Sequence, residues 1–316
     1  MSDDGTSRTE ESKDFLAISE LTERDLRSFV DKALLYQGRF RDGERSFDEL
    51  QGHSVVSLFY ENSTRTRMSF ERATKLLGGE FAYFDIASSS VAKGESVRDT
   101  AMVLESLGFS AVVVRHFSEG VPNQVAKWLE IPVLNAGDGC HEHPSQAVGD
   151  LVTLAERYGS LDALSGMKVA FVGDVTHSRV ARSVSMALSI FGAASIFVGP
   201  PEMVPVGTPV ETYRELDEVI SEVDIAYMLR VQKERLVERE TLDLPSYTRR
   251  FQLNDARATR MKKDAVIMHP GPMNVGVEVD STVSKAIDLL APAQVRNGVF
   301  ARMSILSKLL GGTQSV

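Results

Sequence analysis

Short apolar runs rich in β-branched residues alternate along this chain with longer stretches in which apolar residues recur at helical spacing. The runs span 55–60, 111–114, 133–134, 169–172, 196–198, 225–229 and 266–268. Strands of a parallel sheet have this composition, because helices cover both faces of the sheet and bury the strands. The alternation therefore predicts an α/β fold in which parallel β-sheets are flanked by helices.

The length of the chain favours two domains. Its 316 residues exceed one typical domain, and a helical stretch from about 146 to 158 would join the two halves. We expect a disordered tail at 1–16, a first domain at 17–148, a second domain at 149–291 and a C-terminal helix at 292–316 that packs back on the first domain. Thr22 and Asp25 have the spacing of a capping box for the first helix.

Net charge and cysteine usage argue against several classes of protein. A formal net charge of −9 does not suit the basic face with which proteins bind nucleic acids. Cys140 is the single cysteine, so an internal disulfide is impossible, as is usual in a reducing cytoplasm. No apolar run approaches the roughly 20 residues needed to span a bilayer, and the polar start lacks the apolar segment of a signal peptide. We expect a cytoplasmic protein without nucleic-acid or membrane partners.

Polar and charged residues follow several predicted strands at the point where each strand ends. Arg115, Asp174, Arg230 and His269 all stand at or near such positions. The carboxyl ends of parallel strands share one edge of a sheet, and ligands of open α/β sheets bind at that edge. We therefore expect one active site there, in the cleft between the two domains.

The segment Ser63-Thr64-Arg65-Thr66-Arg67 lies between a predicted strand and a predicted helix. Backbone N–H groups at the start of a helix, together with hydroxyl and guanidinium groups, suit a bound phosphate. The alternative is an ordinary helix cap with two solvated arginines. Spacing favours the phosphate site.

This segment resembles the carbamoyl phosphate signature of the aspartate/ornithine carbamoyltransferase family, and the resemblance extends in order over the chain after the tail. It implies that Ser63, Thr64, Arg65 and Thr66 bind carbamoyl phosphate. The serines at 88–90 and the stretch 93–96 resemble the mobile loop that this family inserts into the active site of the neighbouring subunit. The resemblance implies that Ser89 and Lys93 close over the phosphate and that the enzyme is a homotrimer, whereas a lysine in a serine-rich loop is otherwise usually just solvated.

Three further motifs carry the resemblance around the carbamoyl group. His143-Pro144-Ser145-Gln146 is similar to the His-Pro-Thr-Gln segment of the family, with Ser145 in place of threonine. The family implies that Thr66, Arg115 and His143 donate to the carbamoyl oxygen, that Gln146 reads the NH2 group, and that the backbone carbonyls of Pro270 and Gly271 accept from the same NH2 group.

A zinc site is the rival interpretation of Cys140, His141 and His143. Their spacing does not match the usual paired ligand motifs, and no second cysteine is present to complete a tetrahedron. We therefore expect neither a metal nor a cofactor.

The second half of the chain resembles the amino acid site of the family. The loop that ends at Arg179 lacks the full Gly-x-Gly-x-x-Gly fingerprint of dinucleotide folds. It resembles instead a family loop in which Arg179 would bind the α-carboxylate. Arg230 and Gln232 resemble the aspartate-specific loop, where they would bind the β-carboxylate with help from Lys93. Val275 departs from the pattern, because relatives usually carry arginine there.

The resemblance as a whole implies a carbamoyltransferase that carbamoylates the amino group of L-aspartate, giving N-carbamoyl-L-aspartate and phosphate in de novo pyrimidine biosynthesis. Two alternatives stay open. One is transfer to another amino acceptor, which only Val275 supports. The other is a catalytically silent homologue that acts as a binding scaffold. The sequence does not decide whether regulatory chains or a dihydroorotase partner associate with the enzyme.

Overall fold

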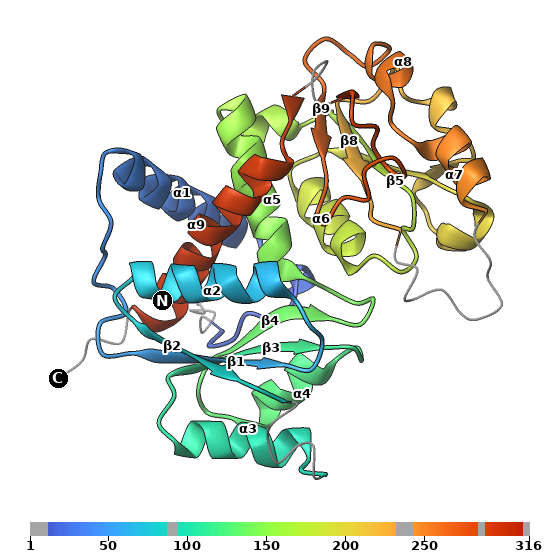
Figure 1. The fold of residues 1–316 in the computed structure, drawn as a ribbon. Coiled ribbons are helices and arrows are strands. Elements are labelled where there is room, and N and C mark those ends of the chain that lie inside the picture. Colours follow the sequence, from blue (N-terminus) through green and yellow to red (C-terminus); the bar gives the residue numbers. More distant parts are fainter. Residues whose placement is uncertain (1–11, 87–93, 232–242, 284–287, 312–316) are drawn as a thin grey trace, which may run out of the picture.

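The computed structural model describes residues 12–86, 94–231, 243–283 and 288–311, and it confirms an α/β fold with two parallel sheets (Figure 1). In the described residues, the first sheet has the order β2-β1-β3-β4 and the second the order β10-β9-β8-β5-β6-β7. Every strand pairing within these sheets is parallel. The strands are β1 (Ser54–Phe59), β2 (Glu80–Phe84), β3 (Ala111–His116), β4 (Val133–Asp138), β5 (Lys168–Val172), β6 (Ala194–Val198), β7 (Glu211–Tyr213), β8 (Ile225–Met228), β9 (Val266–Met268) and β10 (Asp288–Leu289).

Helices cover both sheets. They are α1 (Glu23–Arg41), α2 (Thr64–Leu76), α3 (Val97–Ser106), α4 (Val121–Trp128), α5 (Pro144–Tyr158), α6 (Arg179–Ile190), α7 (Leu244–Phe251), α8 (Asp255–Ala258) and α9 (Ala291–Leu310). Helix α1 begins with the predicted capping box, in which the Thr22 side chain accepts from the backbone N–H of Asp25 and the Asp25 side chain accepts from that of Thr22. None of the described helices is long and apolar enough to cross a membrane.

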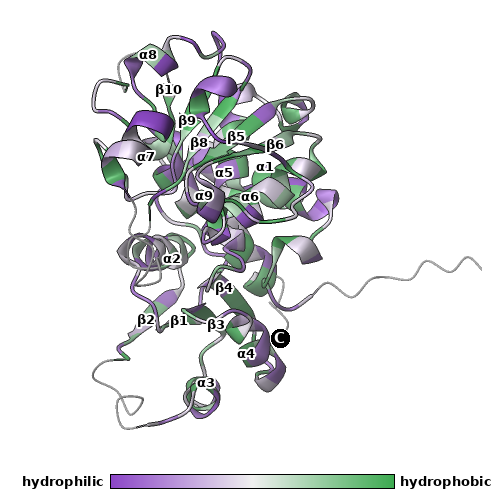
Figure 2. Cartoon of the chain, turned by 90° about the vertical axis from the view of Figure 1, so that its right-hand side faces the viewer, coloured by the Kyte–Doolittle hydropathy of each residue, from purple (hydrophilic) through white to green (hydrophobic). Residues whose placement is uncertain are grey.

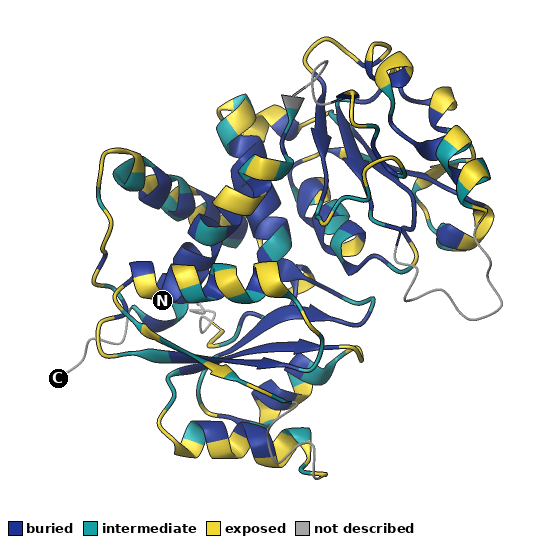
Figure 3. Cartoon of the chain, viewed as in Figure 1, coloured by how far each residue is buried: buried dark blue, intermediate teal, exposed yellow. Residues whose placement is uncertain are grey.

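All seven predicted strands exist, but β2, β7 and β10 were missed. These three lie at or near sheet edges, where burial does not impose a continuous apolar run. Strand β2 is half-exposed along its length, and β7 is only three residues long with Glu211 and Thr212 exposed. Figures 2 and 3 show the contrast, since the central strands of both sheets are hydrophobic and buried, whereas hydrophilic, exposed residues gather on outer helices such as α7 and α8.

A continuous core holds the two domains together. One cluster of buried residues runs from the first sheet through α5 to the second sheet, and it includes Val55, Leu134, Leu151, Phe171 and Tyr227. Helix α9 packs against α1, α2 and α5 (Figure 1). The helices α5 and α9 therefore form the joint that places the carboxyl ends of both sheets next to each other.

The N-terminal segment is ordered earlier than we expected. Phe15 is buried; its N–H donates to the carbonyl of Val133 at 2.9 Å, and its carbonyl accepts from the N–H of Asn135 at 2.9 Å. The Asp14 carboxylate accepts from the N–H of Val133 at 2.8 Å. Residues 14–16 of the expected tail at 1–16 are therefore part of the folded structure, because Phe15 is buried and hydrogen-bonded beside β4.

Candidate active site

Side chains from both domains line one cavity of about 450 Å³. Every described residue that the sequence predicted for the site is on its wall: Ser63, Thr64, Arg65, Thr66, Arg115, His143, Gln146, Arg179, Arg230, Pro270 and Gly271. Three predicted residues, Ser89, Lys93 and Gln232, lie outside the described residues. Residues from Ser63 in the first domain to Gly271 in the second therefore meet in one place.

The start of α2 forms one corner of the cavity. Helix α2 begins at Thr64, after the short connection 60–63 that follows β1, and the Ser63 hydroxyl donates to Thr66 Oγ1 at 2.9 Å. Arg65 turns into the cavity, and burial together with the nearby Arg230 guanidinium lowers its pKa. Arg67 does not line the cavity; its guanidinium lies 4.3 Å from the centre of the Tyr83 ring. The two arginines of the motif thus have different roles.

His143 lies at the start of α5 and is buried. Its backbone N–H donates to Ser183 Oγ at 2.9 Å, which fixes the first turn of the helix. Its Nδ1 has no hydrogen-bond partner among the described residues. Burial, followed by the charges of Arg115, Arg302, Arg179 and Arg65, holds the pKa of His143 well below its usual value. The ring is therefore neutral at physiological pH.

Glu61 joins the two domains across the cavity, and sequence reasoning missed it. Its carboxylate accepts from Arg115 Nη2 at 3.0 Å and from Arg179 Nη2 at 2.7 and 2.8 Å. The two guanidinium groups pass close to Gly137, which has a φ of 114° and where an added Cβ would lie 2.9 Å from Arg115 Nη1. The only signal for Glu61 in the sequence is its place directly after the first strand.

The second domain contributes two cations, one at the start of α6 and one after β8. Arg179 is the first residue of α6, whose start is capped by Ser178 Oγ accepting from the N–H of Ala181 at 3.1 Å. Arg230 follows β8, and the N–H of the next residue, Val231, donates to the buried Glu278 at 2.9 Å. Both arginines are therefore held by elements of the scaffold.

The loop after β9 completes the wall. His269 is buried, and burial with the charges of Arg65 and Arg230 lowers its pKa to about 4. Its Nδ1 accepts from the N–H of Gly271 at 2.8 Å. Gly271 has a φ of 63°, and an added Cβ there would lie 3.3 Å from Arg65 Cζ. This loop of the second domain thus lies against Arg65 at the start of α2.

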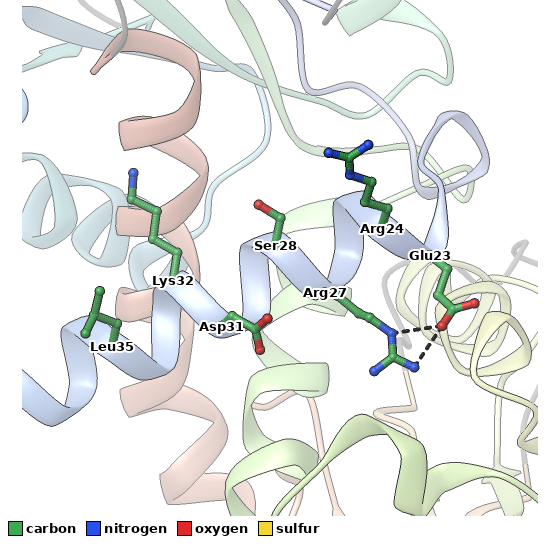
Figure 4. Close-up of a pocket in the computed structure, with 7 residues that line it drawn as sticks. All are labelled: Glu23, Arg24, Arg27, Ser28, Asp31, Lys32 and Leu35. Atoms are coloured by element: carbon green, nitrogen blue, oxygen red, sulfur yellow. Dashed lines mark hydrogen bonds and ion pairs between the residues drawn. The ribbon is translucent and has the colours of Figure 1, made fainter. Parts of the chain in front are cut away.

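Other candidate sites are weaker. Cys140 and His141 do not line the cavity, and His141 Nδ1 lies 3.1 Å from Asp138 Oδ2. No group of three or more metal-ligating side chains occurs in the part of the chain that the structure describes. An open hollow of about 880 Å³ runs along α1, but its lining residues all come from this one helix, with Arg27 paired to Glu23 (Figure 4). Since no second element converges there, we interpret the cavity between the domains as the active site.

Comparisons with known proteins agree with this geometry. Residues 13–156 match the family model described as aspartate/ornithine carbamoyltransferase, carbamoyl-P binding domain, and residues 165–309 match the Asp/Orn binding domain. The aspartate carbamoyltransferase catalytic subunit of Salinispora tropica is 47% identical over 269 residues, covering 83% of this chain and 86% of that protein. The catalytic subunit of Syntrophomonas wolfei is 40% identical over 303 residues, covering 95% and 96%.

Solved structures show the same similarity. The catalytic subunit of M. jannaschii aspartate transcarbamoylase superposes with a TM-score of 0.84 at 32% identity, covering 96% of this chain and 100% of that chain. Aspartate transcarbamoylase from Trypanosoma cruzi, solved with carbamoyl phosphate and aspartate, gives a TM-score of 0.84 at 28% identity, covering 94% and 95%. The T. cruzi enzyme was also solved with N-(phosphonacetyl)-L-aspartic acid.

Proposed function

The chain belongs to the aspartate/ornithine carbamoyltransferase family, and from this premise we propose that it is an aspartate carbamoyltransferase. It transfers the carbamoyl group of carbamoyl phosphate to the amino group of L-aspartate and releases N-carbamoyl-L-aspartate and phosphate. The observation that supports the proposal is one cavity lined by Arg65 from the start of α2 and by Arg179 and Arg230 from the second domain. Relatives of high identity have the same named activity.

Carbamoyl phosphate occupies the part of the cavity formed by the first domain. Ser63, Thr64 and Arg65 bind its phosphate, because the start of α2 offers backbone N–H groups as well as these side chains. Thr66, Arg115 and His143 donate hydrogen bonds to the carbonyl oxygen. Such donors stabilise the negative charge that develops on this oxygen during attack.

Aspartate occupies the part formed by the second domain. Arg179 binds its α-carboxylate, and Arg230, with Gln232, binds its β-carboxylate, since guanidinium groups recognise carboxylates through paired N–H donors. Arg179 can contact Glu61 and the substrate together, because a guanidinium carries five N–H donors.

The chemical step needs no protein base. The unprotonated amine attacks the carbamoyl carbon, so that a C–N bond forms and the C–O bond to phosphate breaks. The proton of the amine passes to a phosphate oxygen as phosphate leaves. Positioning and fixed positive charge supply the catalysis.

The enzyme works as a homotrimer in the cytoplasm, in pyrimidine biosynthesis. Ser89 and Lys93 of a neighbouring subunit complete each site. Exposed hydrophobic side chains on elements that precede and follow the segment 87–93, and next to β3, support such an interface. They are Met68, Tyr83, Met102, Val103, Leu107 and Phe117.

The first experiment measures ureido product from carbamoyl phosphate with a panel of amino acids. We expect L-aspartate to be the preferred acceptor. Arg65→Ala and His143→Ala should each lose at least about a hundredfold in turnover while remaining folded. The control is Arg72→Ala, which removes an exposed arginine of α2, the helix that also carries Arg65, and which should keep its turnover. Wild-type turnover in either active-site variant contradicts the role of that residue. Preference for another amino acid supports the alternative acceptor that Val275 suggests, and no product supports a silent scaffold.

The second experiment tests the shared site. The variants Lys93→Ala and Arg65→Ala, each of which should be inactive alone, are purified separately. They are then mixed under conditions in which subunits exchange. In a hybrid trimer, a site that takes Arg65 from a Lys93→Ala subunit and Lys93 from a neighbouring Arg65→Ala subunit contains both wild-type residues, so activity returns. Absence of any recovery, with exchange verified by labelled subunits, contradicts the homotrimer with shared sites.

A further inference from the structure

Asp150 is a fully buried carboxylate that the mechanism above does not use. It lies on α5, one turn after Gln146, and it is not on the cavity wall. Its Oδ1 accepts from Gln146 Nε2 at 2.9 Å and from Gln294 Nε2 at 2.8 Å, and its Oδ2 accepts from the Tyr227 hydroxyl at 2.6 Å. One acid thus receives donors from α5 and α9, which form the joint of the two domains, and from β8 of the second sheet (Figure 1).

The contact with Asp150 fixes the orientation of the Gln146 amide. A glutamine amide has a donor end and an acceptor end. If the amide of Gln146 were flipped, its carbonyl oxygen would face the carboxylate oxygen of Asp150, and two acceptors would repel each other in a buried site. The nitrogen of Gln146 is therefore committed to Asp150. Gln146 lines the cavity, and the group that remains available to a ligand there is its side-chain carbonyl oxygen.

The Asp150 carboxylate is also linked, through Gln294, to the loop after β9. While Gln294 Nε2 donates to Asp150, Gln294 Oε1 accepts from the backbone N–H of His269 at 2.9 Å. His269 immediately precedes Pro270 and Gly271, whose carbonyls are the other acceptors assigned to the carbamoyl NH2 group. Asp150 therefore positions both sets of acceptors for the NH2 group, directly at Gln146 and through Gln294 at the loop that contains Pro270 and Gly271.

From these contacts we propose that Asp150 is a positioning residue that makes the site selective for an acyl phosphate bearing an NH2 group. This inference rests on the proposed function. The NH2 group satisfies the fixed acceptors with its two N–H donors. A methyl group of the same size satisfies neither, and a site built to bind a hydrogen-bonding group strongly rejects an analogue without it.

Acetyl phosphate is the probe, because it differs from carbamoyl phosphate only by CH3 in place of NH2. In the intact oligomer, with aspartate in excess, we measure kcat and KM for carbamoyl phosphate and the inhibition constant of acetyl phosphate as its competitor. The ratio of inhibition constant to KM is the selectivity. It does not depend on whether acetyl phosphate is turned over.

Four variants separate positioning from a structural role. Asp150→Ala removes the acceptor, and Asp150→Ser, whose hydroxyl ends one bond short of the carboxylate oxygens, is a smaller disturbance should the alanine variant fail to fold. Both should lower the selectivity by about 10- to 100-fold. Asp150→Asn keeps one oxygen for the two amides, and Tyr227→Phe leaves the contact with Gln146 intact. These two should stay within about threefold of the wild-type selectivity, which is less than the loss of one hydrogen bond.

The outcomes are distinct. If Asp150→Ser or Asp150→Ala lowers kcat but leaves the selectivity unchanged, Asp150 only supports the fold and the inference is wrong. If Tyr227→Phe loses as much selectivity as Asp150→Ala, the contact with Gln146 is not the cause, and the inference is wrong as well. Failure of the proposed function looks different, since the wild-type enzyme would then give no ureido product from carbamoyl phosphate and aspartate.

Discussion

Replacing Asp150 by asparagine should change how the stability of the protein depends on pH. Burial raises the pKa of Asp150 from 3.8 to about 6, and the hydrogen bonds from Gln294, Tyr227 and Gln146 only partly oppose this effect. The folded protein therefore binds a proton more tightly than the unfolded chain does. A raised pKa stabilises the fold fully below pH 3.8, and this stabilisation is lost as the pH rises through about 6.

The size of the effect follows from the two pKa values. Between pH 5 and pH 8, the Asp150 carboxyl should withdraw about 1.4 kcal/mol from the free energy of unfolding. Asparagine cannot titrate, so Asp150→Asn lacks this dependence. The quantity to compare is the free energy of unfolding of the wild type minus that of the variant, because groups far from Asp150 contribute equally to both proteins. The nearby Arg302 and Tyr227 have pKa values above the range from pH 5 to pH 8, so they do not titrate in it.

Urea unfolding at pH 5, 6, 7 and 8 measures the difference, with both proteins at the same concentration so that subunit association affects them equally. We expect the difference to decrease by about 1.4 kcal/mol from pH 5 to pH 8. The free energy of unfolding of Tyr227→Phe, taken relative to that of Asp150→Asn, should decrease by more over the same pH range. The reason is that Tyr227→Phe loses a hydrogen bond that favours the ionised Asp150 carboxylate. A difference that is constant with pH, or that increases, refutes the reasoning about Asp150.

Three other predictions concern the cavity itself. Arg230→Ala should raise the KM for aspartate at least about tenfold in steady-state assays and leave that for carbamoyl phosphate nearly unchanged, because a charged hydrogen bond is lost. Glu61→Gln should lower the free energy of urea unfolding by about 3 kcal/mol, since Arg179 is buried and loses its carboxylate. His269 has its pKa lowered to about 4, so its neutral form stabilises the fold above pH 6.5 and this is lost toward pH 4. Relative to His269→Gln, the wild type should therefore lose about 2 kcal/mol in urea unfolding between pH 8 and pH 5.

Much of the site could be predicted because local sequence and sheet direction act together. Arg115, Arg230 and His269 end or follow strands, and parallel strands bring such residues to one edge. The motif at the start of α2 carries its own geometry, since a strand, a helix start and hydroxyl side chains stand in order. The fold class predicted the shared edge within each sheet, and the meeting of the two edges in one cavity also requires the joint formed by α5 and α9.

Residues that depend on distant partners could not be predicted. Gln146 and Asp150 are visibly one helical turn apart, but Tyr227 and Gln294 stand 77 and 144 positions from Asp150 in the chain. Glu61 is an ordinary acid in sequence until Arg179, 118 positions away, arrives beside it. Edge strands such as β2 fail for a related reason, because their exposed face leaves no apolar pattern. The features that the local sequence does not predict are those that depend on contacts between residues far apart in the chain.

In the mechanism proposed above, the charge of the cavity suits His143 to a role as a hydrogen-bond donor and not as a general base. A base must be able to hold a proton near the working pH. Burial and the surrounding arginines make an imidazolium at His143 unfavourable, so a proton taken from the amine would meet four positive charges there. The oxygens of the leaving phosphate carry negative charge, so protonating one of them places no additional cation among the arginines. They are therefore the favoured acceptors of the proton. In this proposal, the arginines that bind the two substrates also direct the proton to the leaving phosphate.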